Sequence, residues 1–131
     1  MIKFLSKYKY IFYTNNVLLI ILYLFPGSLI GCFLYNDCKI QPKIINDFII
    51  SSDHFYIFLI TSAIGYMTFL RSKRINILII YLIFLSITLE LFHFIIPNRS
   101  FEVNDLFGNL SGMLSVSIIF LLFNKYEKSQ N

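Results

Sequence analysis

Four long apolar runs alternate with short polar segments along this chain. They cover residues 10–34, 54–70, 75–96 and 106–123. At a rise of about 1.5 Å per residue, an α-helix needs about 20 apolar residues to cross the hydrocarbon core of a bilayer. The third run meets this length, while the second and fourth need a few flanking residues. The pattern predicts an all-α, polytopic membrane protein with four transmembrane helices in a compact bundle.

A Pro-Gly pair interrupts the first run and predicts a break in its helix. Pro26 lacks a backbone N–H and Gly27 is flexible, so the helix is expected to kink or end near them. Residues 36–52 form the only sizeable loop in the pattern. We therefore expect one membrane domain over residues 10–123, with short basic tails at residues 1–9 and 124–131.

The composition indicates a chain surrounded by lipid. Of its 131 residues, 57% are hydrophobic and 14% are charged, and the mean hydropathy is +0.72. Soluble domains carry about a quarter charged residues, so membrane lipids are the expected partners. The formal net charge of +4 is spread over several segments rather than one stripe. Nucleic acid is therefore not an expected partner.

The basic residues predict an orientation in the membrane. Three lysines precede the first run, three basic residues separate the second run from the third, and two lysines follow the fourth. These make eight of the eleven basic residues. By the positive-inside rule, segments rich in lysine and arginine are cytoplasmic. Both termini are then cytoplasmic, and residues 90–105 face outward.

The cysteines leave two interpretations open near the end of the first run. The lysine-rich start, the apolar run and Leu29-Ile30-Gly31-Cys32 resemble a bacterial lipoprotein signal with its lipobox cysteine. Cleavage and lipidation at Cys32 would leave three spans in the same orientation. A disulfide between Cys32 and Cys38 is the other use of these thiols, if the compartment is oxidising.

Ionisable residues gather at the boundary between the third and fourth runs. Glu90 and His93 lie three positions apart and share a helical face, and Arg99 follows shortly after Pro97. Such groups lose their water in the bilayer core, so they usually mark pairing or function. Polar or small stripes also occur on the fourth run at Asp105, Gly108, Asn109 and Gly112, and on the second at His54, Thr61, Gly65 and Thr68. We expect the three stripes to pack together.

Some of these residues also have plain structural explanations. Asn104 or Asp105 can be the N-cap of the fourth helix, and the two glycines of that run can serve close helix packing. Arg99 can extend along the interface toward water. Glu90 is harder to explain, because the helical rise places it about 9 Å inside the end of its run. It is expected to pair with Arg99 or a histidine, or to be uncharged.

The sequence predicts no cofactor. His54, Glu90, His93 and Asp105 have side chains that bind metal ions in other proteins, but their spacing matches no recognised metal motif. Neither cysteine lies in a thiol-catalysis motif, and no serine lies in a G-x-S-x-G context. We therefore expect neither a metal site nor another cofactor.

The polar motif resembles that of the VanZ-like family of small bacterial integral membrane proteins. It consists of Glu90, Pro97-Asn98-Arg99, Asp105, Asn109 and Gly112. Weaker matches are Pro26-Gly27-Ser28 in the first run and Asp53-His54-Phe55 at the start of the second. The likeness covers residues 10–123. It departs from the family at His93, where a glutamine is usual, and in the Asp-Lys element, which lacks its lysine.

The resemblance implies a compact helical membrane domain of the cell envelope, without a defined catalytic activity. The founding member of the family is associated with low-level resistance to the glycopeptide teicoplanin. A link to glycopeptide resistance is therefore one expectation for this chain.

Three functions fit the sequence. The first is binding of a lipid or glycan headgroup at the outer face, such as that of a cell-wall precursor or a polyprenyl-linked glycan. Arg99 would contact the anionic group, while Glu90, His93, Asp105 and Asn109 shape the pocket. The second is an enzyme acting on a lipid-linked phosphate or sugar, with Glu90 or His93 as general base. The third is a structural subunit of a membrane complex. The non-enzymatic first function is the working hypothesis.

Overall fold

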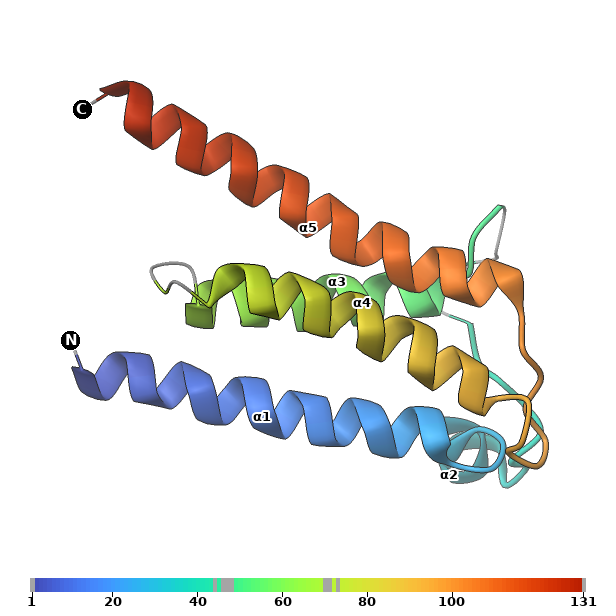
Figure 1. Cartoon of the computed structure of the whole chain (residues 1–131). Helices are drawn as coiled ribbons and strands as arrows, with labels where there is room; N and C mark the ends of the chain where they lie inside the picture. Colours follow the sequence, from blue (N-terminus) through green and yellow to red (C-terminus); the bar gives the residue numbers. More distant parts are fainter. Residues whose placement is uncertain (1, 44, 46–48, 70–71, 73, 131) are drawn as a thin grey trace.

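A computed structural model shows an all-helical chain in the part that it describes, residues 2–43, 45, 49–69, 72 and 74–130. The helices are α1 (Ile2–Leu24), α2 (Leu29–Tyr35), α3 (Ser52–Phe69), α4 (Ile75–Phe92) and α5 (Val103–Gln130). The all-α prediction is confirmed. The four long helices run side by side, and both chain ends lie at one end of the bundle (Figure 1).

α3 occupies the middle of the bundle, because it contacts α1, α4 and α5. Glycines on α5 make its contact with α3 close. A Cβ added at Gly108 would lie 2.6 Å from the carbonyl oxygen of Ser51, and one at Gly112 would meet the carbonyl oxygen of Phe55. The predicted small residues on α5 thus bring the two backbones together, since residues without bulky side chains allow helices to approach closely.

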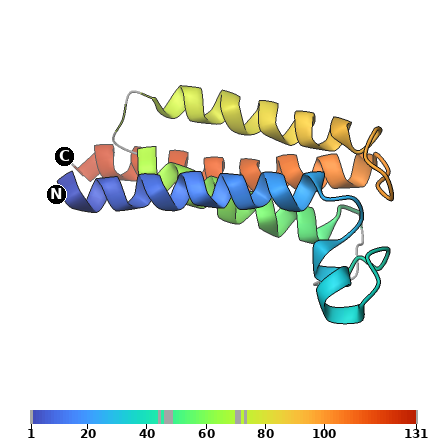
Figure 2. The ribbon, with the colours of Figure 1, turned by 90° about the horizontal axis from the view of Figure 1, so that it is seen from below.

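The chain bends sharply between α1 and α2. The two helices differ in direction by 76° (Figure 2). Gly27 has a φ of +90° in the turn, and Ser28 caps α2 by accepting a 3.0 Å hydrogen bond from the backbone N–H of Gly31. The left-handed φ favours glycine, and proline cannot continue the hydrogen bonding of α1. The break therefore falls where the Pro-Gly pair predicts it.

The ends of α4 and α5 differ from the apolar runs. α4 ends at Phe92, and the next residues form tighter turns before Pro97, since a residue that precedes proline disfavours helix. Asn98 then turns the chain with a φ of +59°. α5 begins at Val103, and the carbonyl of Glu102 accepts its first bond, from the N–H of Leu106. The N-cap prediction for Asn104 or Asp105 is therefore wrong.

The outward faces of the bundle are apolar. On α4, Ile80 and Phe84 are each 67% exposed, and α5 likewise exposes Ile119 and Leu122. α4 and the Val103–Tyr126 part of α5 are long and apolar enough to cross a membrane, and the bent pair α1 and α2 adds a third span if it counts as one. The structure therefore supports two or three spans by length and composition. The fourth span and the orientation stay predictions.

Candidate functional site

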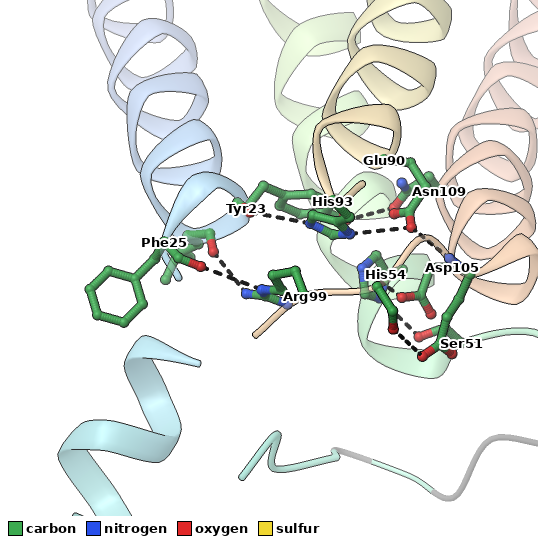
Figure 3. Close-up of polar contacts among 12 residues, drawn as sticks. Tyr23, Phe25, Ser51, His54, Glu90, His93, Arg99, Asp105 and Asn109 are labelled. Carbon is green, nitrogen blue, oxygen red and sulfur yellow. Dashed lines mark hydrogen bonds and ion pairs between the residues drawn. The ribbon is translucent and has the colours of Figure 1, made fainter. Parts of the chain in front are cut away.

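Polar side chains gather at the end of the bundle opposite the two termini (Figure 3). They come from the last turn of α1, the start of α3, the end of α4 and the start of α5. All six predicted site residues lie in this region: His54, Glu90, His93, Arg99, Asp105 and Asn109. Two apolar clusters fill the bundle beside and below them. The predicted packing of three polar stripes is therefore right for His54, but the rest of its stripe faces away from the site: Thr61 accepts a hydrogen bond from Asn15 of α1, and Gly65 lies against Leu78 and Phe12.

Glu90 is fully buried and lies at the centre of the group. Its Oε1 accepts a 3.1 Å hydrogen bond from the backbone N–H of Glu102 and lies 3.2 Å from Nδ1 of His93. Its Oε2 has no hydrogen-bond partner in the described part of the chain. Of the two partners expected for Glu90, the structure supplies the histidine and not Arg99.

His93 connects Glu90 to α1. Its Nε2 lies 3.2 Å from the backbone carbonyl oxygen of Tyr23, and its ring stacks on that of Tyr23 at an interplanar angle of 16°. A carbonyl oxygen only accepts hydrogen bonds, so Nε2 carries a hydrogen. The contact between Nδ1 and Glu90 Oε1 then holds one shared proton. Either His93 is an imidazolium beside a carboxylate, or neutral His93 accepts the proton of a carboxyl group.

Tyr23 is a member of this group that the sequence interpretation missed. Its hydroxyl donates a 2.6 Å hydrogen bond to Oδ1 of Asn109, which joins α1 to α5. Both side chains are buried, and Nδ2 of Asn109 has no partner among the residues described. A tyrosine inside an apolar run is a usable signal, because a buried phenolic hydroxyl usually has a hydrogen-bond partner.

His54 and Asp105 form a second pair at the surface side of the group. Nε2 of His54 lies 3.5 Å from Oδ2 of Asp105, and Nδ1 of His54 lies 2.9 Å from the hydroxyl of Ser51. The backbone N–H of Ser51 also donates to the carbonyl of Asn104, which ties the start of α3 to the start of α5. Ser51 was missed as well, since it lies in a loop outside every helical stripe.

Arg99 caps the end of α1. Its Nη2 donates to the carbonyl of Leu22 at 3.1 Å, and its Nε donates to the carbonyl of Phe25 at 3.4 Å. In a continuing helix, the carbonyl of Leu22 would accept the N–H of residue 26, but Pro26 has none. Arg99 supplies the missing donor. A cation at a helix C-terminus is also favoured by the helix dipole.

Two opposing effects act on the pKa of Arg99. Burial lowers the pKa of its guanidinium below the ordinary value, and the nearby Tyr23, Asp105 and Glu90 counteract that effect. Arginine has so high an ordinary pKa that the side chain remains a cation at neutral pH. The site therefore holds a half-buried, permanent positive charge.

A pocket of about 140 Å³ opens beside Arg99. Arg99, His54 and Asp53 provide ionisable groups on its wall, and Leu29 and Ile57 are among its apolar lining residues. The pocket thus combines a fixed cation with an apolar surface. This combination suits an amphiphilic ligand with a small anionic group.

The segment after α1 forms the outer side of this pocket. A disulfide joins Cys32 of α2 to Cys38. The thiol of Cys32 is therefore not free for lipid attachment, in contrast to the lipobox interpretation.

Three side chains at the site are close enough to bind one metal ion. His54, Glu90 and Asp105 each offer a ligand atom, and these atoms lie within 4.8 Å of one another.

Comparisons with protein-family models, with curated proteins and with solved structures found no match. The resemblance to the VanZ-like family therefore stays a prediction.

Proposed function

We propose that this chain is a multi-pass protein of the bacterial cytoplasmic membrane that binds the anionic headgroup of a lipid or lipid-linked glycan. The observation that carries the proposal is the position of Arg99 on the wall of the pocket. Its Nε and Nη2 are held by the carbonyls at the end of α1, while its Nη1 makes no hydrogen bond to any described residue. The guanidinium is thus oriented and still has N–H groups to donate.

The shape of the pocket supports a headgroup attached to an apolar tail. A volume of about 140 Å³ suits a group the size of a phosphate rather than a whole glycan. The apolar wall beside it, with Leu29, Ile30 and Ile57, offers a path for the acyl or prenyl chain. Charge-assisted hydrogen bonds from arginine to phosphate are strong and often bidentate, so Arg99 selects anionic headgroups over neutral ones.

Two observations support an outer-face location for this pocket. Most of the basic residues belong to the two terminal segments and to the connection between α3 and α4. Both termini lie at the end of the bundle opposite the pocket (Figure 1). The positive-inside rule makes that end cytoplasmic, and the disulfide near the pocket agrees with an oxidising outer side. Cell-wall precursors and their polyprenyl carriers are lipids with anionic headgroups at this face. A link to glycopeptide resistance rests on the VanZ-like resemblance alone.

Binding to defined lipids by the purified protein tests the proposal. Detergent-solubilised protein, kept in a chelator, is titrated with fluorescent polyprenyl phosphate and with neutral polyprenol. We expect saturable binding of the phosphate, weakened about tenfold to a hundredfold by Arg99→Gln, because a hydrogen bond to a charged group contributes about 1.5–3 kcal/mol. Arg74→Gln is the matched control, since Arg74 lies at the opposite end of the bundle.

Three further outcomes separate the alternatives. Arg99→Lys retains the charge without the fork of donors, so an intermediate affinity supports headgroup recognition. Release of inorganic phosphate or of a sugar from the bound lipid would show an enzyme instead. If Arg99→Gln unfolds the protein while Arg99→Lys binds as the wild type does, the role of Arg99 is to cap α1. Equal affinity for polyprenol and its phosphate would reject the proposal.

A further inference from the structure

We infer that His54, Glu90 and Asp105 form a binding site for one divalent metal ion, and that Zn²⁺ is the ion it fits best. The separation of 3.5 Å between His54 Nε2 and Asp105 Oδ2 carries the geometry. Two ligand atoms at about 2.0–2.1 Å from a tetrahedral zinc ion are roughly 3.4 Å apart. A ligand atom of Glu90 lies within 4.8 Å of both others, close enough to complete a three-ligand set by a small side-chain rotation.

An unpartnered oxygen of Glu90 is the second observation. The Glu90 side chain is fully buried, yet its Oε2 has no hydrogen-bond partner within the described residues. Leaving a buried acceptor unsatisfied is costly, and a carboxylate oxygen in that position favours a cation. Because Oε1 is already engaged by His93 and the N–H of Glu102, Oε2 is the atom available to an ion.

The surrounding hydrogen bonds orient the ligands as in established metal sites. Nδ1 of His54 is held at 2.9 Å from the hydroxyl of Ser51, which directs Nε2 toward Asp105. His93 holds the other oxygen of Glu90. Metal-binding histidines and carboxylates usually have partners of this kind, which fix the ring and the carboxylate before the ion binds. Hydrogen-bond partners therefore orient two of the three metal ligands, His54 and Glu90.

The position of the site gives the ion an entry path and an open coordination position. His54 also lines the pocket beside Arg99, so an ion can reach it from that side. Three protein ligands leave a fourth position for water or an anionic group, as in catalytic rather than structural zinc sites. The metal site does not depend on the headgroup proposal, since its three ligands belong to the chain itself.

The choice of ion follows from the ligands. One imidazole nitrogen with two carboxylate oxygens suits Zn²⁺, and the affinity order of first-row ions places Zn²⁺ above Mn²⁺ and Fe²⁺. Mg²⁺ and Ca²⁺ prefer six or more oxygen ligands, which this site does not offer. We expect Zn²⁺ to bind at least tenfold more tightly than Mn²⁺ and to resist competition by Mg²⁺ and Ca²⁺.

Zinc titration of the purified full-length protein tests the inference. The protein is prepared without a polyhistidine tag, stripped with a chelator, kept free of added lipid and titrated with Zn²⁺ against a fluorescent zinc indicator. We expect one zinc ion per chain. Asp105→Asn and His54→Gln should each weaken binding by more than tenfold, and Ser51→Ala by roughly 10–100-fold. Asp37→Asn is the matched control at an exposed acid of the same end and should leave the affinity unchanged.

Two measurements on the wild type keep the inference testable if a variant misfolds. Zn²⁺ at about 100 times its dissociation constant should raise the melting temperature by several degrees. Co²⁺ in place of Zn²⁺ should give the visible absorption of a low-coordinate cobalt site without thiolate bands. No saturable zinc binding by the wild type, or binding that Asp105→Asn and His54→Gln both leave intact, would overturn the inference. Because the headgroup assay contains chelator and the zinc assay contains no lipid, either proposal can fail alone.

Discussion

The hydroxyl of Tyr23 and Oδ1 of Asn109 are 2.6 Å apart, although the two residues are 86 positions apart in the sequence. The hydrogen bond joins the last turn of α1 to the first turns of α5 inside the bundle. These two helices have few other contacts, because α3 and α4 lie between them. The bond therefore fixes the distance between two helices that otherwise meet only through their neighbours.

Removing this hydroxyl should destabilise the protein. Tyr23→Phe keeps the ring stacked on His93 but leaves the buried Oδ1 of Asn109 without a donor. We expect the free energy of unfolding in detergent to fall by about 1–3 kcal/mol, which is the cost of an unsatisfied buried acceptor. Tyr10→Phe is the control, because Tyr10 is 74% exposed. Equal unfolding midpoints for the two variants would contradict this role of the bond.

Glu90→Gln should also lower stability, for a geometric reason. Oε1 of Glu90 faces both the N–H of Glu102 and Nδ1 of His93, and the Glu90–His93 contact holds a shared proton. A glutamine with its oxygen in that place still satisfies Glu102, but the oxygen has no proton to donate to a neutral His93 and no negative charge to compensate an imidazolium. Turned the other way, its NH₂ group faces the N–H of Glu102. Either orientation loses a hydrogen bond or the charge that compensates His93, so we expect a loss of about 1–3 kcal/mol in the free energy of unfolding.

The matched control for this change is Glu102→Gln. Glu102 is exposed, and its side chain only accepts a hydrogen bond from Ser100, so the substitution should change stability by less than about 0.5 kcal/mol. Chemical denaturation in detergent, followed by circular dichroism, measures both variants. A Glu90→Gln protein as stable as Glu102→Gln would show that the shared proton contributes nothing.

The helical part of the fold was accessible from sequence because it depends on local pattern. Apolar runs predict membrane helices, and Pro26 with Gly27 predicts the bend. The ends of the helices were harder to predict. α4 stops at Phe92 because of turns that precede Pro97, and α5 continues to Gln130 through polar residues that no apolar run includes. Helix ends depend on such local competition, which hydropathy does not record.

The sequence predicted which residues lie at the site, but not which of them contact one another. Helical spacing brought Glu90, His93 and Asn109 onto inward faces, as the structure has them. Arg99, however, was expected to pair with Glu90, and its guanidinium instead contacts the end of α1, where it supplies the donor that Pro26 lacks. That pairing joins segments more than 70 positions apart, and no spacing rule connects them.

The contact between α5 and α3 gives a third prediction. Gly112→Ala places a methyl group against the backbone carbonyl of Phe55, which cannot move without shifting α3. Alanine otherwise favours a helix by about 1 kcal/mol over glycine, so a loss of stability must come from the contact. We expect a net loss of roughly 1–3 kcal/mol in the free energy of unfolding.

Gly65→Ala is the control for this glycine. The added Cβ would lie 3.0 Å from the side-chain ends of Leu78 and Phe12, which can rotate away. We expect a smaller loss than for Gly112→Ala, or a gain from helix propensity. If both variants lose the same stability, glycine at position 112 has no special packing role. Unfolding in detergent under identical conditions measures the pair.

The orientation is open to a direct test by cysteine labelling. In a background with Cys32→Ser and Cys38→Ser, a single cysteine is placed by Ser100→Cys at the site end or by Ser129→Cys near the end of α5. Both serines are exposed, and Ser100 is preferred to Asn98 because the positive φ of Asn98 disfavours cysteine. A membrane-impermeant maleimide applied to intact cells should label Ser100→Cys, whereas Ser129→Cys should react only after lysis. The reverse pattern would place Arg99 and its pocket in the cytoplasm, where a precursor headgroup of the outer face cannot reach it. Labelling of both positions in intact cells would instead show that the two ends of the bundle face the same side, which four spans do not allow.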